Sequence, residues 1–163
     1  SPRRKPAARK RSGHRIARLV SGGQTGVDRA ALDVALALGI PCGGWCPRDR
    51  RAEDGAIPER YPLAETASPS YVVRTRRNVV ESDATLILTL GRPTGGTAKT
   101  IRFALALAKP HLVVDLDSDP DPVEVRSWLS DVRPQTLNVA GPRESTAPGI
   151  HRRARAFLKA VFA

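Results

Sequence analysis

The feature that most limits the fold of this chain is a repeated order of apolar run, glycine-containing turn and amphipathic helix. The apolar runs are expected to form strands at residues 16–20, 40–45, 84–90, 111–116 and 136–140. Strands that alternate with helices pair in parallel, because each crossover helix returns the chain to the same end of the sheet. The order therefore predicts an α/β, Rossmann-like three-layer sandwich: a parallel sheet of about five or more strands with helices on both faces.

The helices between these strands show apolar residues at helical spacing. They are expected up to Leu38, over residues 71–80, after Thr97, after Asp121 and from Ile150 onward. A capped helix start is predicted at Asp121, because a proline follows it at the first helical position and a glutamate at the third. Residues 47–70 look irregular, and a loop of this length is a candidate ligand cover.

Length and composition indicate one domain. The chain has 163 residues, of which 40% are hydrophobic, and we expect residues 16–163 to form a single core. An apolar run of about 18 residues is absent, so we expect neither a membrane span nor a signal peptide, and a cytoplasmic protein. Cys42 and Cys46 are expected to be reduced, buried thiols, because a closed thiolate metal site needs two more ligands.

The formal net charge of +11 is unevenly distributed. Residues 1–15 carry seven Lys or Arg and no acid, and the remainder carries 20 basic and 16 acidic residues, a difference of +4. The first segment has too little apolar surface to fold and is expected to be a disordered basic tail. It could attract polyphosphate surfaces, but it has no aromatic residue for stacking, so we do not expect specific nucleic-acid binding.

Three loops rich in Gly, Ser and Thr follow predicted strands, at residues 21–26, 94–97 and 141–145. The carboxyl ends of parallel strands meet at one edge of a sheet, where ligands of such folds bind. Unpaired N–H groups at a helix start attract anions, and glycine permits close approach. The loops therefore predict a site for a small anionic, phosphate-bearing ligand, and Gly23→Val is expected to block it without altering the fold.

The first loop has other possible interpretations. The glycines could serve only to make turns, with Thr25 and Asp28 forming a capping box. A Walker loop needs Gly-Lys-Ser/Thr after the glycines, and a dinucleotide loop needs glycine at position 21. Neither pattern is present, so the loop predicts anion binding without indicating a particular nucleotide.

Several motifs in order resemble the putative molybdenum carrier family, also called the molybdenum cofactor carrier family. The resemblance covers about residues 16–163 and leaves out the basic tail. The family is part of a wider Rossmann-like group that includes cytokinin-activating phosphoribohydrolases. The motifs are VSGGQTGVDRAALD at 20–33, GGWCP at 43–47, RAEDG at 51–55, IP at 57–58, YPL at 61–63, Arg74, Thr75, Asn78, Ser82, Asp83, GGT at 95–97 and LNVAGPR at 137–143.

The resemblance implies a homo-oligomeric carrier, dimer or tetramer, that binds, protects and transfers the molybdenum cofactor without catalysis. Phosphate, sulfate or a molybdate-like oxyanion could occupy the same loops, and molybdoenzymes would be the clients. Carried over to this sequence, the cofactor-binding residues would be Gly22, Gly23, Gln24, Thr25, Gly26, Arg74, Asn78, Gly95, Gly96 and Thr97. Catalytic and metal-ligating residues are not expected.

Some of these side chains have alternative interpretations. Arg74 and Asn78 are one helical turn apart and could point together into the crevice, or could belong to a solvated helix face. Glu53 and Asp54 could orient the N–H edge of a pterin, or could pair with Arg50 and Arg51, and the salt bridges are slightly favoured.

Two other functions remain open. A nucleotide-processing N-glycosidic hydrolase would resemble the phosphoribohydrolases, but those carry Pro-Gly-Gly-x-Gly-Thr-x-x-Glu, and this chain has Thr100 where the acid would fall. Asp28, Glu53, Asp54 or Asp115 could replace that acid, and the spacing selects none of them. A sensor for a nucleotide-like ligand would need no catalytic group.

Overall fold

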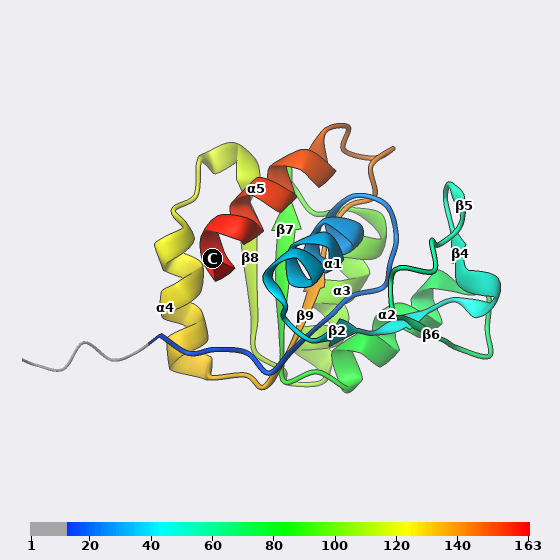
Figure 1. The fold of residues 1–163 in the computed structure, drawn as a ribbon, viewed down its shortest axis with the longest axis horizontal. Coiled ribbons are helices and arrows are strands. Elements are labelled where there is room, and N and C mark those ends of the chain that lie inside the picture. Colours follow the sequence, from blue (N-terminus) through cyan, green and yellow to red (C-terminus); the bar gives the residue numbers. More distant parts are fainter. Residues whose placement is uncertain (1–12) are drawn as a thin grey trace, which may run out of the picture.

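The computed structural model describes residues 13–163, which form a parallel five-stranded sheet between two layers of helices (Figure 1). The predicted fold class is confirmed. The predicted tail lies outside the described residues over 1–12, and His14 hydrogen-bonds the carbonyl oxygen of Pro134, so part of the expected tail contacts the domain. In sheet order the strands are β2 (Cys42–Gly43), β1 (Arg18–Val20), β9 (Thr136–Ala140), β7 (Ala84–Thr89) and β8 (His111–Asp115).

The handedness of the crossovers explains which helices cover each face. The connections from β1 to β2 and from β8 to β9 run in one direction across the sheet, and those from β2 to β7 and β7 to β8 run in the other. Right-handed crossovers then place α1 and α4 on one face and α2 and α3 on the other, and α5, which follows the last strand, packs beside α1 and α4 (Figure 1). The helices are α1 (Val27–Leu38), α2 (Tyr71–Val80), α3 (Gly95–Ala106), α4 (Pro122–Val132) and α5 (Ile150–Phe162).

The core lies around β7 and β9. Every residue of β7 is buried, because both faces of this central strand are covered, which agrees with its nearly continuous apolar sequence. Ile87 of β7 pairs with Val113 of β8 and with Ala140 of β9. The expected strand 40–45 is divided into β2 and β3 (Trp45–Cys46) at Gly44, whose φ of +126° breaks the ladder.

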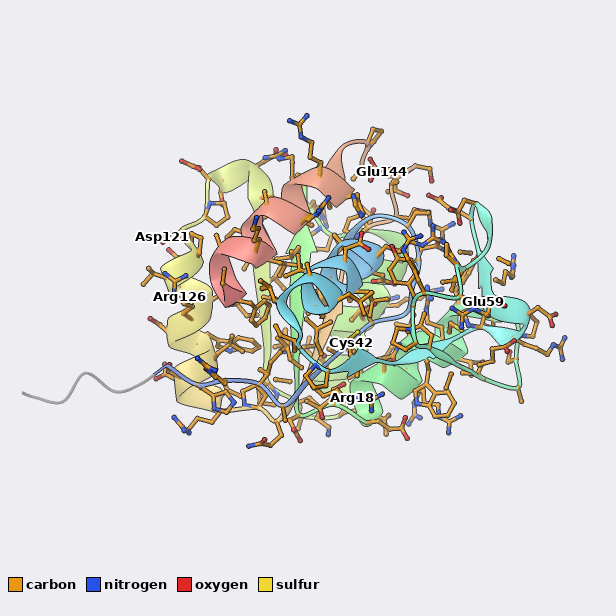
Figure 2. All side chains as sticks on the ribbon, viewed as in Figure 1. Arg18, Cys42, Glu59, Asp121, Arg126 and Glu144 are labelled. Carbon is orange, nitrogen blue, oxygen red and sulfur yellow. The ribbon has the colours of Figure 1, made fainter. Side chains whose placement is uncertain are left out.

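Carboxylate side chains cap the N-termini of α4 and α5, two of the helices on the α1 face of the sheet. The Asp121 carboxylate accepts from the Val123 N–H at 3.0 Å, which confirms the predicted cap of α4. Glu144, labelled in Figure 2, accepts from the N–H groups of Gly149 and His151 and so caps α5. Within residues 13–163, none of the helices is long and apolar enough to cross a membrane.

The segment 47–70 is more ordered than the sequence suggested. It contains β4 (Arg51–Ala52), which pairs with β5 (Gly55–Ala56), and β6 (Ala64–Glu65), which pairs with β3. Its organising residue is Arg50, whose guanidinium donates to four backbone carbonyls within the segment: those of Ile57, Pro58, Tyr61 and Leu63. The prediction of an irregular loop was wrong, because pairing over two residues leaves no periodic signal.

Candidate ligand-binding cleft

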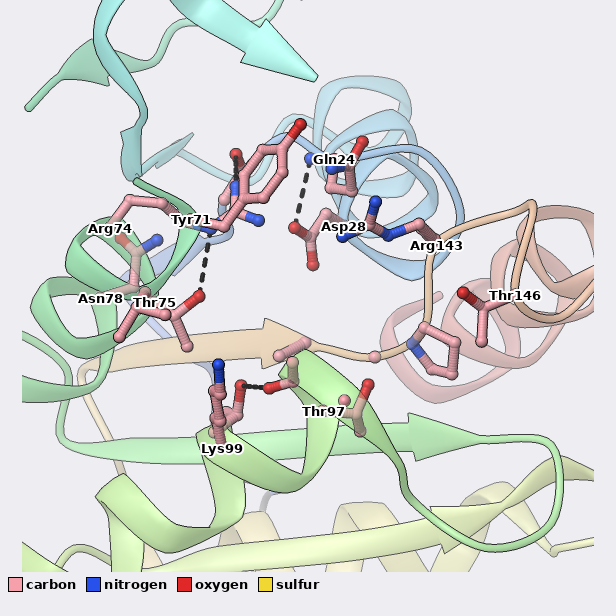
Figure 3. A pocket seen from close by; sticks show the side chains of 18 of the residues that line it. Gln24, Asp28, Tyr71, Arg74, Thr75, Asn78, Thr97, Lys99, Arg143 and Thr146 are labelled. Carbon is pink, nitrogen blue, oxygen red and sulfur yellow. Dashed lines mark hydrogen bonds between the residues drawn. The ribbon is translucent and has the colours of Figure 1, made fainter. Parts of the chain in front are cut away.

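A cavity of about 570 Å³ lies beyond the carboxyl ends of β1, β9 and β7 (Figure 3). Its place is a topological switch point, because the chain leaves β9 toward α5 on one face and leaves β7 toward α3 on the other. The volume is within the range of roughly 300 to 1,000 Å³ typical of small-ligand sites. The loops after β1, β7 and β9 all contribute to its lining, as the sequence predicted.

The N-terminus of α3 is open toward the cavity. The N–H groups of Thr97 and Ala98 bond to the Thr94 carbonyl, whereas those of Gly95 and Gly96 have no partner among the described residues. A Cβ built at either glycine would meet nothing within 4 Å. These two N–H groups, with the positive end of the helix dipole, are therefore available to an oxyanion.

In the loop after β1, three successive N–H groups, those of Gly23, Gln24 and Thr25, already have partners within the loop or in α1. The Gln24 N–H donates to Asp28 Oδ2 at 3.2 Å and the Thr25 N–H to Gln24 Oε1 at 3.1 Å, and the Gly23 N–H faces Ser21 Oγ at 3.4 Å. The expected donor role of Gly23 and Thr25 does not fit this arrangement. Of the ten predicted residues, those that line the cavity are Gly22, Gln24, Arg74, Asn78, Gly95, Gly96 and Thr97, and those that do not are Gly23, Thr25 and Gly26.

Two of the loop glycines serve packing instead. Gly23 has a φ of +76°, and a Cβ there would overlap Leu63 and lie 3.0 Å from Ile57 Cδ1. Gly26 has a φ of +81°, and its Cβ would overlap the carbonyl oxygen of Pro142. Gly23→Val would therefore distort the fold, and the expectation that this substitution acts only on the ligand is wrong.

The capping-box interpretation of this loop was also wrong. The Thr25 hydroxyl donates to Glu53 and accepts from the Glu144 N–H at 3.1 Å, so it joins three segments that are distant in sequence. In a capping box the Asp28 carboxylate would accept from the Thr25 N–H, but it accepts from the Gln24 N–H. Gly26, without a side chain, occupies the cap position of α1.

Arg74 is a buried cation at the cavity wall. Its side chain reaches from α2 to the loop after β1, where Nη1 donates to the Gly22 carbonyl at 2.8 Å, and Nε donates to Thr75 Oγ1 at 3.2 Å. The residue is 7% exposed, and within residues 13–163 it forms no ion pair within 4 Å. Burial lowers the pKa of Arg74, and the charge of Asp28 opposes this shift. Because Arg74 is buried, the solvated-face interpretation is wrong for this residue, and a buried charge without a direct ion pair is costly.

Asn78 is also buried but has a different task. Its Oδ1 accepts from the Trp45 N–H at 2.8 Å, and its Nδ2 donates to the Trp45 carbonyl at 3.0 Å. The side-chain amide thus completes the backbone hydrogen bonding of β3 and fixes α2 beside the sheet. Asn78 lines the cavity, but both polar atoms of its amide already bond the backbone of Trp45, so its main role is to hold α2 against β3.

Among the described residues, Asp28 is the one acidic residue in the cavity lining, beside four basic ones. It lies in the first turn of α1, 6% exposed, with Oδ2 bonded to the Gln24 N–H. Burial raises the pKa of Asp28 from 3.8 to about 6, against the opposing effects of Arg74 and of this hydrogen bond. The sequence named Asp28 among four possible acids, and its place on the apolar face of an amphipathic helix was the signal that could have selected it. The basic residues are Arg51, Arg74, Lys99 and Arg143.

Tyr71, which the sequence analysis missed, is surrounded by three of these arginines. The guanidinium carbon of Arg51 lies 4.6 Å from the ring centroid, and those of Arg74 and Arg143 each lie 5.2 Å from it. In Figure 3 the ring stands at the edge of the cavity beside Arg74. Three guanidinium groups around one ring give this wall a strongly positive potential.

Glu53 and Asp54 are held by salt bridges outside the cavity lining. Asp54 forms a two-pronged pair with Arg29, with Nη2 and Oδ1 at 2.7 Å, and Glu53 approaches Arg143 Nε at 4.0 Å. Burial would raise the pKa of Glu53, but hydrogen bonds from Ser145 and Thr25 outweigh it and lower the pKa. Both acids form salt bridges, as favoured, but the expected partners Arg50 and Arg51 were wrong, because the partners are Arg29 and Arg143. Neither acid lines the cavity, so they are not placed to orient a ring there.

Comparison with known proteins agrees with this architecture. The model of the circularly permutated YpsA SLOG family matches residues 19–162. The chain belongs to this family. A solved structure from Syntrophus aciditrophicus SB, named "putative molybdenum carrier protein", is 42% identical to the chain and has a TM-score of 0.90. That match covers 93% of this chain and 98% of the other. Among curated proteins, none matches the chain.

The cysteines of this YpsA SLOG family member lie apart from the cleft lining. Cys46 is fully buried, as predicted, whereas Cys42 is half-buried, and burial raises the pKa of both thiols. Over the described part of the chain, His, Cys, Asp and Glu side chains do not gather in groups of three or more that could hold a metal ion.

Proposed function

We propose that this protein binds the molybdenum cofactor, or a related phosphate-bearing oxyanion ligand, in the cleft and holds it without catalysis. The name of the Syntrophus aciditrophicus structure supports this choice of ligand. The cofactor is a pterin with a dithiolene, a molybdenum oxo centre and a terminal phosphate, so it combines a planar ring with anionic groups. We further propose a cytoplasmic homo-oligomer that delivers the cofactor to molybdoenzymes.

The observation that carries the proposal is the buried, unpaired guanidinium of Arg74. Arginine has five N–H donors, and only two of those of Arg74 have partners among the described residues, which leaves three. Two parallel N–H groups of one guanidinium match the oxygens of a phosphate or a metal oxyanion. A bound anion would pair directly with a buried charge that Asp28 opposes only from beyond ion-pair distance.

The open N-terminus of α3 supports a second contact on the facing wall. Gly95 and Gly96 offer backbone N–H groups, and Lys99 lines the cavity one turn further along. An oxyanion there would receive hydrogen bonds without any covalent attachment. Contacts of this kind hold a ligand tightly and still let it leave, as delivery to another protein requires.

The test is to identify the ligand of protein purified without oxygen. Molybdenum is measured by elemental analysis, and the pterin is detected by its fluorescence after denaturation and oxidation. The proposal predicts both in equal amounts, approaching one per chain. Absence of both from protein produced in cells that make the cofactor would refute it.

Asp28 favours one alternative, a hydrolase that cleaves an N-glycosidic bond. A carboxyl group with a pKa of about 6, inside a cavity, is suited to give or take a proton near neutral pH. Release of free base from a nucleoside monophosphate, abolished in Asp28→Asn, would establish this activity. Tight binding of a nucleotide without turnover would instead indicate a sensor.

A further inference from the structure

Gln24 has a buried hydrogen-bond donor that nothing in the described chain satisfies. Its Oε1 accepts from the Thr25 N–H at 3.1 Å and from the Glu53 N–H at 2.9 Å, so the orientation of the amide is fixed. Its Nε2 is buried and has no partner within residues 13–163. The residue lines the cavity and is only 4% exposed. A buried amide donor without a partner is costly and rare in folded proteins, which indicates that a ligand acceptor completes it.

Asp28 lies beside Gln24 and provides the opposite polarity. Its Oδ2 is held by the Gln24 N–H at 3.2 Å, and Oδ1 has no hydrogen bond among the described residues. Figure 3 shows the carboxyl group pointing into the cavity, across from Arg74 and Tyr71. A donor amide and an acceptor carboxylate therefore lie next to each other in the same buried lining.

We propose that Gln24 and Asp28 together recognise the 2-amino-4-oxo edge of a pterin-type ring. The carboxylate accepts from the ring N–H and the 2-amino group, and Gln24 Nε2 donates to the 4-oxo oxygen. The anionic groups of the ligand are then left to Arg74 and the N-terminus of α3. This assignment rests on the proposed function, and it gives to Asp28 the role that sequence reasoning had considered for Glu53 and Asp54.

The charges around Asp28 support a carboxylate in this role. Arg74 from α2, Arg29 from α1 and Arg143 from the loop after β9 all lower its pKa, and only desolvation raises it. Lys99 of α3 lines the same cavity. A ring that donates two hydrogen bonds to Asp28 adds to this stabilisation of the ionised form, so ring binding and ionisation favour each other.

The experiment compares two fluorescent probes, a 6-alkylpterin phosphate and the corresponding lumazine phosphate, in which oxygen replaces the 2-amino group. Affinities are measured at pH 7 by fluorescence titration on the full chain, with inorganic phosphate as a third ligand. We expect the wild type to prefer the pterin at least tenfold, because the lumazine loses a hydrogen bond to a charged group. The preference should fall as the pH is lowered from 7 to 5, since protonation removes the acceptor.

Three variants separate recognition from folding. In Asp28→Asn the preference should disappear, while inorganic phosphate binds no worse, because a negative charge has been removed. In Gln24→Glu both rings should bind at least tenfold more weakly, because both carry the 4-oxo oxygen and an acceptor replaces the donor. Asp49→Asn removes one exposed carboxylate outside the cavity and should keep the full preference.

The outcomes distinguish this inference from the proposed function. Equal affinity of the wild type for pterin and lumazine, or a preference that survives in Asp28→Asn, would overturn the inference. Binding of phosphate but of neither ring would overturn it too, and would leave the oxyanion site intact. Failure of the wild type to bind any of the three ligands would refute the proposed function itself.

Discussion

Replacement of Arg74 by methionine separates a ligand-binding charge from a structural one. Methionine is shorter than arginine but keeps an unbranched apolar stem, and it removes the guanidinium, which is buried without a direct ion pair. The loss of the hydrogen bond to the Gly22 carbonyl costs about 1.5–3 kcal/mol. The variant also no longer has to bury a charge, and this gain offsets the lost hydrogen bond to a similar extent. We therefore expect the free energy of unfolding of the ligand-free protein to change by less than about 2 kcal/mol.

The effect on the ligand should be larger. Two charge-assisted hydrogen bonds to one oxyanion are together worth about 3 kcal/mol after competition with water, so the dissociation constant should rise about 100-fold. Isothermal titration calorimetry with molybdate and with phosphate measures this rise, and thermal unfolding without ligand measures stability. Arg76→Met, on the exposed face of the same helix, is the matched control and should bind as the wild type does. Unchanged affinity in Arg74→Met, or an equal loss in Arg76→Met, would refute the reasoning.

Three further predictions concern the walls of the cleft. Gly96→Val should weaken phosphate binding at least tenfold in a titration and leave the melting temperature unchanged, because its Cβ meets open space, whereas Gly23→Val should lower the melting temperature. Asn78→Ala should lower the free energy of unfolding by about 2–4 kcal/mol in urea titrations, because two backbone groups of β3 lose their partner. Asp28 has a higher pKa in the folded state, about 6 against 3.8, so the folded state binds its proton more tightly and stability falls as the pH rises between these values. Asp28→Asn should remove this loss, about 3 kcal/mol, and become more stable than the wild type at pH 8 but not at pH 3.5; a constant difference across that range would contradict the assignment.

The sheet could be predicted from the sequence because its signals are local. The continuous apolar run of β7, the cap of α4 and the glycines after the strands each act within a few residues, and their order determines a right-handed α/β topology. The prediction of one strand over residues 40–45 was wrong because its end depends on a contact that is not local. The strand is interrupted at Gly44, where a Cβ would overlap the backbone oxygen of Ser21, a contact between distant segments.

The place of the cavity could be predicted from the sequence, but the contacts of the residues that line it could not. The three loops meet at the predicted sheet edge, yet three N–H groups of the loop after β1 donate to the side chains of Ser21, Gln24 and Asp28. Side-chain partners of this kind depend on tertiary packing and leave no periodic signal. The same holds for Tyr71, whose three arginines come from β4, α2 and the loop after β9.

The most direct test of the central claim is the ratio of molybdenum to protein in wild type and Arg74→Met purified side by side without oxygen. Cells that make the cofactor should yield wild-type protein with molybdenum and pterin in equal amounts, approaching one per chain. The variant should carry less than a tenth of that amount, since we propose that the anionic ligand pairs with the buried guanidinium. Equal molybdenum in both proteins, or none in the wild type, would contradict the account.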